Sequence, residues 1–382
     1  MDALKITKEE IRQRQAAARD ILKKEGRDAL IAEGGCGISQ RAWLRYFLDY
    51  YVPVFTEYLV LPLEGPVVFF ARSEENSRQV LERGAADEVV LLPPWESHKG
   101  PGQFVAQALK SCGISRPALC GEVSAMFLAS LMLGLGELPF VDLTPKLEAI
   151  RMIKSEAELA LCREAVALNE AVFLELLKSV RPGSREMEAV ARASAFARRL
   201  NCEDQLWLIG SGRAPRPRSL AAATQLCHTW RKGELCSAVI EIAGSGGYFG
   251  EIAHLVSIGK PQEEVRRAFR ALSQARREGE KLIRPGSPAG AAPLRISQAL
   301  MEEGYWQAPY PGVMGHGQGL DMSEGPMLAA ENEMPLQPGM RVNLHPALTL
   351  KSGAQVTACD CYEVTETGCA NLSALPDEII VL

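Results

Sequence analysis

Short apolar runs alternate with amphipathic segments through the first 145 residues of the chain. Segments with a helical spacing of apolar residues, such as 73–83 and 103–112, lie between several of these runs. The runs have the length of strands and occur at Ala29–Ile31, Tyr58–Leu63, Val67–Ala71, Val89–Leu92 and Ala118–Cys120. Strands that alternate with helices favour a layered fold. We therefore predict an α/β N-terminal domain over residues 1–145, and we find no catalytic motif in it.

A different pattern begins near residue 146 and occurs twice. A helical segment opens with a capping box at Ser155 and Glu158, and a second helix and strand-like runs follow it. The same order then returns. The tetrapeptide Arg-Pro-Gly-Ser ends the first helix of each series, at 181–184 and at 284–287. This repetition predicts a duplicated α+β domain over residues 146–382, with its active site between the two halves.

Composition and charge narrow the class of protein. A chain of 382 residues favours two domains, and 47% hydrophobic with 23% charged residues is typical of a globular protein. The net charge of −5 comes without the clustered basic residues of a nucleic-acid-binding protein. The first residues do not resemble a secretory signal, and no run of about 18 uncharged apolar residues predicts a membrane span. The ten cysteines lack disulfide spacing, so we expect reduced thiols and a cytoplasmic protein.

The candidate chemistry gathers in the C-terminal domain. Four of the five histidines lie there beside glycine, proline or carboxylate residues: His228, His254, His316 and His345. Glycines on both sides of His316, in Gly-His-Gly-Gln-Gly-Leu, allow a ligand to approach the backbone closely. Glu241 lies within an apolar run that predicts a buried strand, where an unpaired carboxylate is costly. We therefore expect Glu241 to belong to a functional site.

Several motifs together resemble one known family. These are the Gly-His-Gly-Gln-Gly-Leu run at 315–320, Pro-Gly-Met at 338–340 followed by a strand and Pro346, and a last strand that ends in Val364-Thr365. Residues 147–155 resemble the segment that begins the catalytic domain of the same family. The family is that of Xaa-Pro dipeptidase, aminopeptidase P and creatinase. The resemblance implies a duplicated "pita-bread" catalytic domain behind a creatinase-like N-terminal domain.

The resemblance also implies a set of site residues. Metallopeptidases of this family hold two divalent ions with two Asp, one His and two Glu, and the five positions fall here on Glu241, Glu251, His316, His345 and Cys359. Only the histidine is retained, and a second family histidine falls on Ser323. We therefore expect no dinuclear metal site and no required cofactor. A single zinc, manganese or iron ion on these same five residues is the alternative.

Roles follow from the creatinase side of the family, which cleaves C–N bonds without a metal pair. His228 lies thirteen residues before Glu241, near the place of the proton-transfer histidine of creatinase, and imidazole suits acid–base work at neutral pH. We expect Glu241 and Glu251 to position water or attack the substrate, with His316 and His345 stabilising an oxyanion. The expected substrate contacts are Tyr248, His254, Asp321 and Cys359.

Three functions compete at this stage. The preferred one is a hydrolase that cleaves an amide or amidine C–N bond in a small substrate by a creatinase-like route. The second is a metal-dependent Xaa-Pro dipeptidase or aminopeptidase with an altered metal site, and the third is an inactive binding protein on the same scaffold. The expected partners are a small-molecule or dipeptide-like substrate and, because the relatives dimerise, a second copy of the chain. We expect neither nucleic acid nor membrane as a partner.

Overall fold

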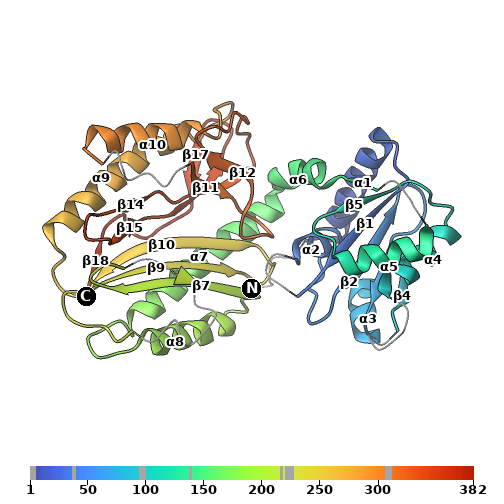
Figure 1. Ribbon diagram of the computed structural model, residues 1–382, viewed down its shortest axis with the longest axis horizontal. Coiled ribbons are helices and arrows are strands. Elements are labelled where there is room, and N and C mark those ends of the chain that lie inside the picture. Colours follow the sequence, from blue (N-terminus) through green and yellow to red (C-terminus); the bar gives the residue numbers. More distant parts are fainter. Residues whose placement is uncertain are drawn as a thin grey trace. The chain divides into compact units, whose positions relative to one another are not determined.

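The computed structural model describes residues 6–36, 40–93, 100–136, 140–215, 228–305 and 312–382, together with the backbone of Arg218–Ser219. The chain forms two compact units, one extending to Arg151 and the other from Met152 to Leu382 (Figure 1). The division falls in the last turn of helix α6 (Thr144–Met152), a few residues beyond the sequence boundary at 145. The start of α6 bonds to the first unit, because Thr144 Oγ1 accepts a hydrogen bond from the Gly121 N–H.

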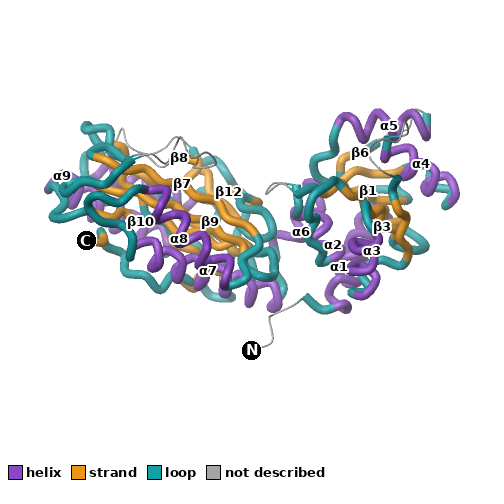
Figure 2. Tube along the Cα trace, turned by 90° about the horizontal axis from the view of Figure 1, so that it is seen from below, coloured by secondary structure: helices purple, strands orange, loops and turns teal. Residues whose placement is uncertain are grey.

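The first unit is an α/β layer, as predicted. Its six strands lie in the order β4-β3-β2-β1-β5-β6, with β1 antiparallel to β2 and parallel to β5. Figure 2 shows helices α4 and α5 on one face of this sheet and α1 and α3 on the other. The elements are α1 (Lys8–Lys24), β1 (Ala29–Gly34), α2 (Ala42–Leu48), β2 (Glu57–Pro62), β3 (Val68–Ala71), α3 (Glu74–Glu82), β4 (Glu88–Leu91), α4 (Pro101–Ser111), β5 (Pro117–Cys120), α5 (Ala125–Leu135) and β6 (Val141–Asp142).

The second unit contains two five-stranded sheets of similar build. One has the order β18-β10-β9-β7-β8 and the other β12-β11-β13-β16-β17. The helices are α7 (Glu156–Leu177), α8 (Glu186–Arg199), α9 (Glu263–Glu280) and α10 (Ala291–Glu302). The strands are β7 (Asp204–Gly212), β8 (Arg218–Ser219), β9 (Leu235–Ala243), β10 (Phe249–Ser257), β11 (Val313–Gly317), β12 (Glu324–Ala329), β13 (Arg341–Leu344), β14 (Ala347–Thr349), β15 (Gln355–Thr357), β16 (Asp360–Val364), β17 (Cys369–Asn371) and β18 (Ile380–Val381).

Each sheet packs one face against its own pair of helices. Ile240, Ile242 and Ile252 share an apolar core with residues of α7 and α8, and Val342 and Leu344 share another with α9 and α10. The strands lie between the two helix pairs in Figure 1. Because side chains alternate along a strand, the remaining residues of β9, β10 and β13 point to the inner faces of the sheets. Polar side chains on these inner faces can therefore meet. No helix among the described residues is long and apolar enough to cross a membrane.

The two Arg-Pro-Gly-Ser turns confirm the internal duplication. Gly183 and Gly286 adopt the same left-handed conformation, with φ of +88° and +80°. In the first turn the Gly183 N–H donates to the Trp230 carbonyl, and the Trp230 N–H donates to Ser184. In the second turn Gly286 and Ser287 make the same pair of bonds with Leu336. The repeated tetrapeptide therefore ties the helix pair to the start of β9 in one half and of β13 in the other.

Candidate active site

A pair of buried glutamates forms one side of the site. Glu241 on β9 and Glu251 on β10 lie directly opposite each other in the antiparallel register. Their residues are 8% and 4% exposed, so two carboxyl groups share one largely water-free place. Burial raises the pKa of Glu241 well above its usual value, and the charge of Glu251 raises it further. This arrangement favours a state in which one of the two carboxyl groups holds a proton.

Two histidines lie close to Glu251, one on the second sheet and one directly after its strand β13. His316 Nε2 on β11 lies 3.6 Å from Glu251 Oε2, and the rings of His316 and His345 have centroids 5.0 Å apart. One donor atom from each of these three residues lies within 4.8 Å of the others. Burial lowers the pKa of His316, and the nearby Glu251 only partly opposes this shift, so the ring is neutral at pH 7.

The hydrogen bond to the Gly317 carbonyl defines the tautomer of His316. Nδ1 lies 2.9 Å from that oxygen. A carbonyl can only accept, so Nδ1 carries the proton of the neutral ring. Nε2 then presents its lone pair toward Glu251. A lone pair in this place can take a proton from water or bind a metal ion.

Side-chain amides hold both carboxylates. Asn343 Nδ2 donates to Glu251 Oε2 at 2.7 Å, and Gln318 Nε2 donates to Glu241 Oε2 at 3.2 Å. Gln318 in turn accepts from the guanidinium of Arg341 at 2.6 Å. Sequence reasoning missed these three residues. A signal was present for two of them, because Arg341 and Asn343 alternate along one strand and therefore share a face, and His345 follows directly after that strand.

Cys359 lies beside the same carboxylates. Its N–H donates to the Ala253 carbonyl, two residues beyond Glu251 on β10. Burial raises the pKa of its thiol well above the usual value, and the charge of Glu251 adds to that effect, so the thiol is neutral at pH 7. The structure thus brings together the five side chains that the family resemblance singled out.

The structure does not bring His228 to this cluster. His228 Nε2 lies 2.8 Å from a carboxylate oxygen of Glu234, just before β9 begins. Seven residues of extended chain separate Glu234 from Glu241, which corresponds to roughly 23 Å at about 3.3 Å per residue. Nearness in sequence therefore misled the expectation of a proton shuttle, because strand β9 carries the two groups apart.

Two of the expected substrate contacts lie on the helix side of β10. The Tyr248 hydroxyl donates to Glu158 Oε1 at 2.6 Å, and the His254 ring stacks on Phe173 with centroids 4.9 Å apart. Both partners belong to α7, on the opposite side of the sheet from Glu251. Asp321 is half-buried in the turn after β11, where its carbonyl accepts from the Gly319 N–H. Its role as a substrate contact stays a prediction.

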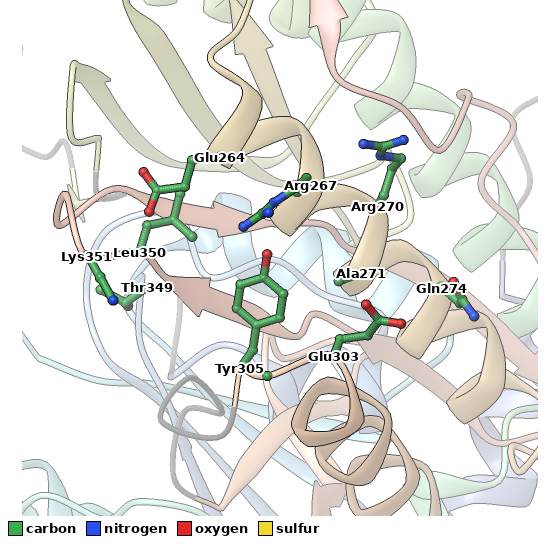
Figure 3. Close-up of a pocket in the computed structure, with 11 residues that line it drawn as sticks. Glu264, Arg267, Arg270, Ala271, Gln274, Glu303, Tyr305, Thr349, Leu350 and Lys351 are labelled. Carbon is green, nitrogen blue, oxygen red and sulfur yellow. The ribbon is translucent and has the colours of Figure 1, made fainter.

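A pocket of about 790 Å³ lies elsewhere on this unit, as Figure 3 shows. Its walls come from α9, from the end of α10 and from the β14–β15 hairpin. None of the predicted site residues lines it. The lining residues are Glu264, Arg267, Arg270, Ala271, Gln274, Glu303, Gly304, Tyr305, Thr349, Leu350 and Lys351. These side chains are mostly exposed, so we place the candidate site at the buried cluster instead.

Comparison with known proteins decides the family. The model of metallopeptidase family M24 matches residues 160–366, which is more than half of the chain. The chain belongs to metallopeptidase family M24. The model of the creatinase/prolidase N-terminal domain matches residues 14–153. Both domain types predicted from the sequence are thereby confirmed, and the M24 assignment makes the protein a member of a hydrolase family.

Relatives of this M24 chain include named dipeptidases. The probable dipeptidase PepE of Mycobacterium tuberculosis is 29% identical over 332 residues, which cover 85% of each chain. The crystal structure of dipeptidase PepE from Mycobacterium ulcerans matches with a TM-score of 0.81 and 25% identity, over 99% of both chains. That of X-Pro aminopeptidase from Thermotoga maritima matches with a TM-score of 0.82 and 20% identity, over 96% of this chain and 99% of that one. The last likeness shows the shared fold.

The M24 name implies divalent metal ions, and the clustered side chains fit one ion better than two. The donor atoms of Glu251, His316 and His345 are close enough together to bind a single ion. Two ions about 3.5–4 Å apart need carboxylates that clamp both of them. Glu241 and Glu251 are the carboxylates among the described cluster residues, and amide donors already hold both. The charge of Arg341 lies directly behind one of these amides. This set does not fit a metal pair.

Proposed function

We propose that this M24 protein is a hydrolase that cleaves a C–N bond in a small amide, amidine or dipeptide-like substrate without a pair of divalent ions. One observation carries the proposal. A metal pair would need bridging carboxylates, and the described residues of the cluster supply two, Glu241 and Glu251, to which the side-chain amides of Gln318 and Asn343 already donate hydrogen bonds. The catalytic residues in this proposal are Glu241, Glu251, His316 and His345.

The first step uses the lone pair of His316. Nε2 takes a proton from a water molecule while the water oxygen attacks the carbonyl or amidine carbon. An N–H of the neighbouring His345 ring donates to the atom on which negative charge develops. Because the Nδ1–H of His316 is already bonded to the Gly317 carbonyl, the ring is held with Nε2 toward the reacting water. The product of this step is a tetrahedral intermediate and a protonated His316.

The second step uses the carboxyl pair. The C–N bond breaks, its electron pair goes to the leaving nitrogen, and that nitrogen takes the proton shared by Glu241 and Glu251. The proton on His316 then returns to the carboxyl pair and restores the starting state. Close like charges keep one carboxyl protonated, which supplies the acid at neutral pH. Water and an amide or peptide give an acid and an amine, and water and an amidine give an amide and an amine, with no other reactant.

A second candidate is supported by the spacing of three donor atoms. Glu251, His316 and His345 would hold a single divalent ion, and the protein would then be a metal-dependent peptidase with an altered site. Glu251, His316 and His345 would hold the ion, which would supply Lewis-acid activation of water and of the scissile carbonyl. The relatives named as dipeptidases favour dipeptides as substrates for this candidate.

One experiment separates the candidates. The purified protein is analysed for metal content and assayed on simple amides, amidines and Xaa-Pro dipeptides, before and after chelation. We expect hydrolysis of at least one class that persists after chelation. Activity restored by one equivalent of metal selects the second candidate, and a requirement for two equivalents overturns both. Absence of hydrolysis in all three classes, with or without added metal, leaves the binding-protein alternative.

The proposal also includes a homodimer in a reducing compartment, in keeping with the family resemblance. Apart from Cys120, eight cysteines among the described residues are free thiols, and five of these eight are buried. Free thiols of this kind are typical of the cytoplasm. Light scattering should give twice the 41.6 kDa of one chain at micromolar concentration. A mass of one chain would contradict the dimer.

A further inference from the structure

Arg341 is a buried cation without a salt bridge. It is fully buried on β13, and among the described residues no carboxylate forms an ion pair with it. Its guanidinium donates to the Phe249 carbonyl at 2.9 Å, to Gln318 Oε1 at 2.6 Å and to Cys361 Sγ at 3.0 Å. All three acceptors are neutral. Because an unpaired buried charge is strongly unfavourable, charge of opposite sign must compensate it from a longer distance.

The compensating charge is that of Glu241, which is connected to Arg341 through one intervening side chain, Gln318. Gln318, also fully buried, bonds Arg341 on one side and Glu241 on the other. Arginine has no acceptor atom, so Gln318 must turn its oxygen to Arg341 and its NH2 group to Glu241. On the other branch, Cys361 links Arg341 to the backbone carbonyl of Glu251 through its thiol, at 3.0 Å. Hydrogen bonds therefore connect the guanidinium to the carboxylate of Glu241 and to the backbone of Glu251.

We propose that Arg341 is the built-in cation of this site, a positioning residue that orients Glu241 through Gln318 and supplies fixed positive charge to the buried carboxyl pair. This inference rests on the proposed hydrolase without a metal pair. It explains how two carboxyl groups remain together in a buried place when no metal pair binds them. It also predicts that the fixed charge weakens the binding of any divalent ion to Glu251, His316 and His345.

The test compares Mn²⁺ binding and catalysis in three variants of the full chain. Arg341→Met keeps most of the volume and removes the charge, Arg341→Lys keeps the charge, and Gln318→Met breaks the link to Glu241. We expect Arg341→Met to bind Mn²⁺ on the order of tenfold or more tightly in calorimetric titration. Arg341→Lys should bind Mn²⁺ as the wild type does but lose turnover, because an ammonium cannot reproduce the planar fork of hydrogen bonds.

Gln318→Met tests the orientation of Glu241 if Arg341→Met does not fold. The amide of Gln318 donates to Glu241, so its removal should raise the pKa of the carboxyl pair. The corresponding limb of the pH–rate profile should then move to higher pH. If Gln318 had only a structural role, the profile would not move. The control is Arg45→Met, which removes a buried arginine from the other unit, where Asp49 is its ion-pair partner. Equal Mn²⁺ affinity in the wild type and Arg341→Met, or an unshifted profile in Gln318→Met, would overturn the proposal. If the wild type needs two metal ions for activity, the proposed function is refuted. The effect of Arg341→Met on Mn²⁺ affinity can still be measured in that case, so the two failures are distinguishable.

Discussion

At the residue scale, His316 and His228 show that nearness in the sequence does not predict nearness in the structure. His316 faces Glu251, whereas His228 is bonded to Glu234 at the start of β9. We predict that His316→Asn lowers kcat/KM by roughly 10²–10⁴-fold, because it removes the base from the cluster. His228→Gln should stay within a few-fold of the wild type. The measurement is steady-state kinetics on the substrate found in the screen above. A loss in His228→Gln as large as in His316→Asn would restore His228 as the acid–base group.

His254 makes a separate prediction about stability. Burial lowers the pKa of His254 to about 4, and the nearby charge of Arg276 contributes to this shift. Between the folded value and the usual value near 6.5, the unfolded chain binds a proton that the folded chain does not. Stability therefore falls as pH decreases through this range, by about 2 kcal/mol between pH 8 and pH 5.

The check on His254 is urea unfolding at pH 8 and pH 5. We expect His254→Gln to be less sensitive to this change of pH than the wild type, even though it loses the stacking on Phe173 and is less stable at pH 8. Equal sensitivity in the two proteins would contradict the assignment of the pH effect to this ring.

At the scale of elements, apolar pattern and turn residues were the informative signals. The five apolar runs of the first unit coincide with strands, and the repeated Arg-Pro-Gly-Ser marks equivalent turns in the second unit. The contact between Gln318 and Arg341 could not be predicted, because 23 residues separate them and only the pairing of β11 with β13 brings them together. The family motif found the five clustered side chains, but their hydrogen-bond partners depend on this tertiary register.

The twin turns provide a test at the same scale. Gly183 and Gly286 have positive φ, and a Cβ at either position would meet no atom within 4 Å. Replacement by Ala therefore introduces backbone strain alone, and we expect each variant to lose about 1–2 kcal/mol in free energy of unfolding. Gly368→Ala is the control, because its surroundings are equally open and its φ is not in the left-handed region. Denaturant titration of the three variants checks the result, and an equal loss in Gly368→Ala would exclude strain as the cause.

At the scale of the whole molecule, the last residues of the chain connect the two halves of the catalytic unit. Strand β18 pairs in parallel with β10 of the first half, and Asp377 forms an ion pair with Arg276 on α9 of the second half at 2.8 Å. Arg276 also pairs with Asp360, which follows Cys359 of the site. The tail thus bonds to the first sheet and to α9, and Arg276 of α9 bonds in turn to Asp360 of the second sheet. Loss of these last residues should therefore destabilise the whole catalytic unit, because the tail contacts several of its elements.

Replacing Asp377 by Asn tests this role of the tail. Burial alone would raise the pKa of Asp377, but the charge of Arg276 and hydrogen bonds from Ser273 and Arg277 outweigh it, so the pKa is lowered. A lowered carboxyl pKa stabilises the fold above the usual value near 3.8, and this contribution disappears as pH falls through the folded value. We expect Asp377→Asn to lose roughly 2 kcal/mol in free energy of unfolding at pH 7 and to show less acid sensitivity than the wild type in that range.

Glu378→Gln is the matched control, because this neighbouring side chain is exposed and forms no ion pair among the described residues. Thermal unfolding of the three proteins at pH 7 and pH 3.5 is the measurement, and an equal effect of the two substitutions would show that the ion pair with Arg276 does not hold the tail.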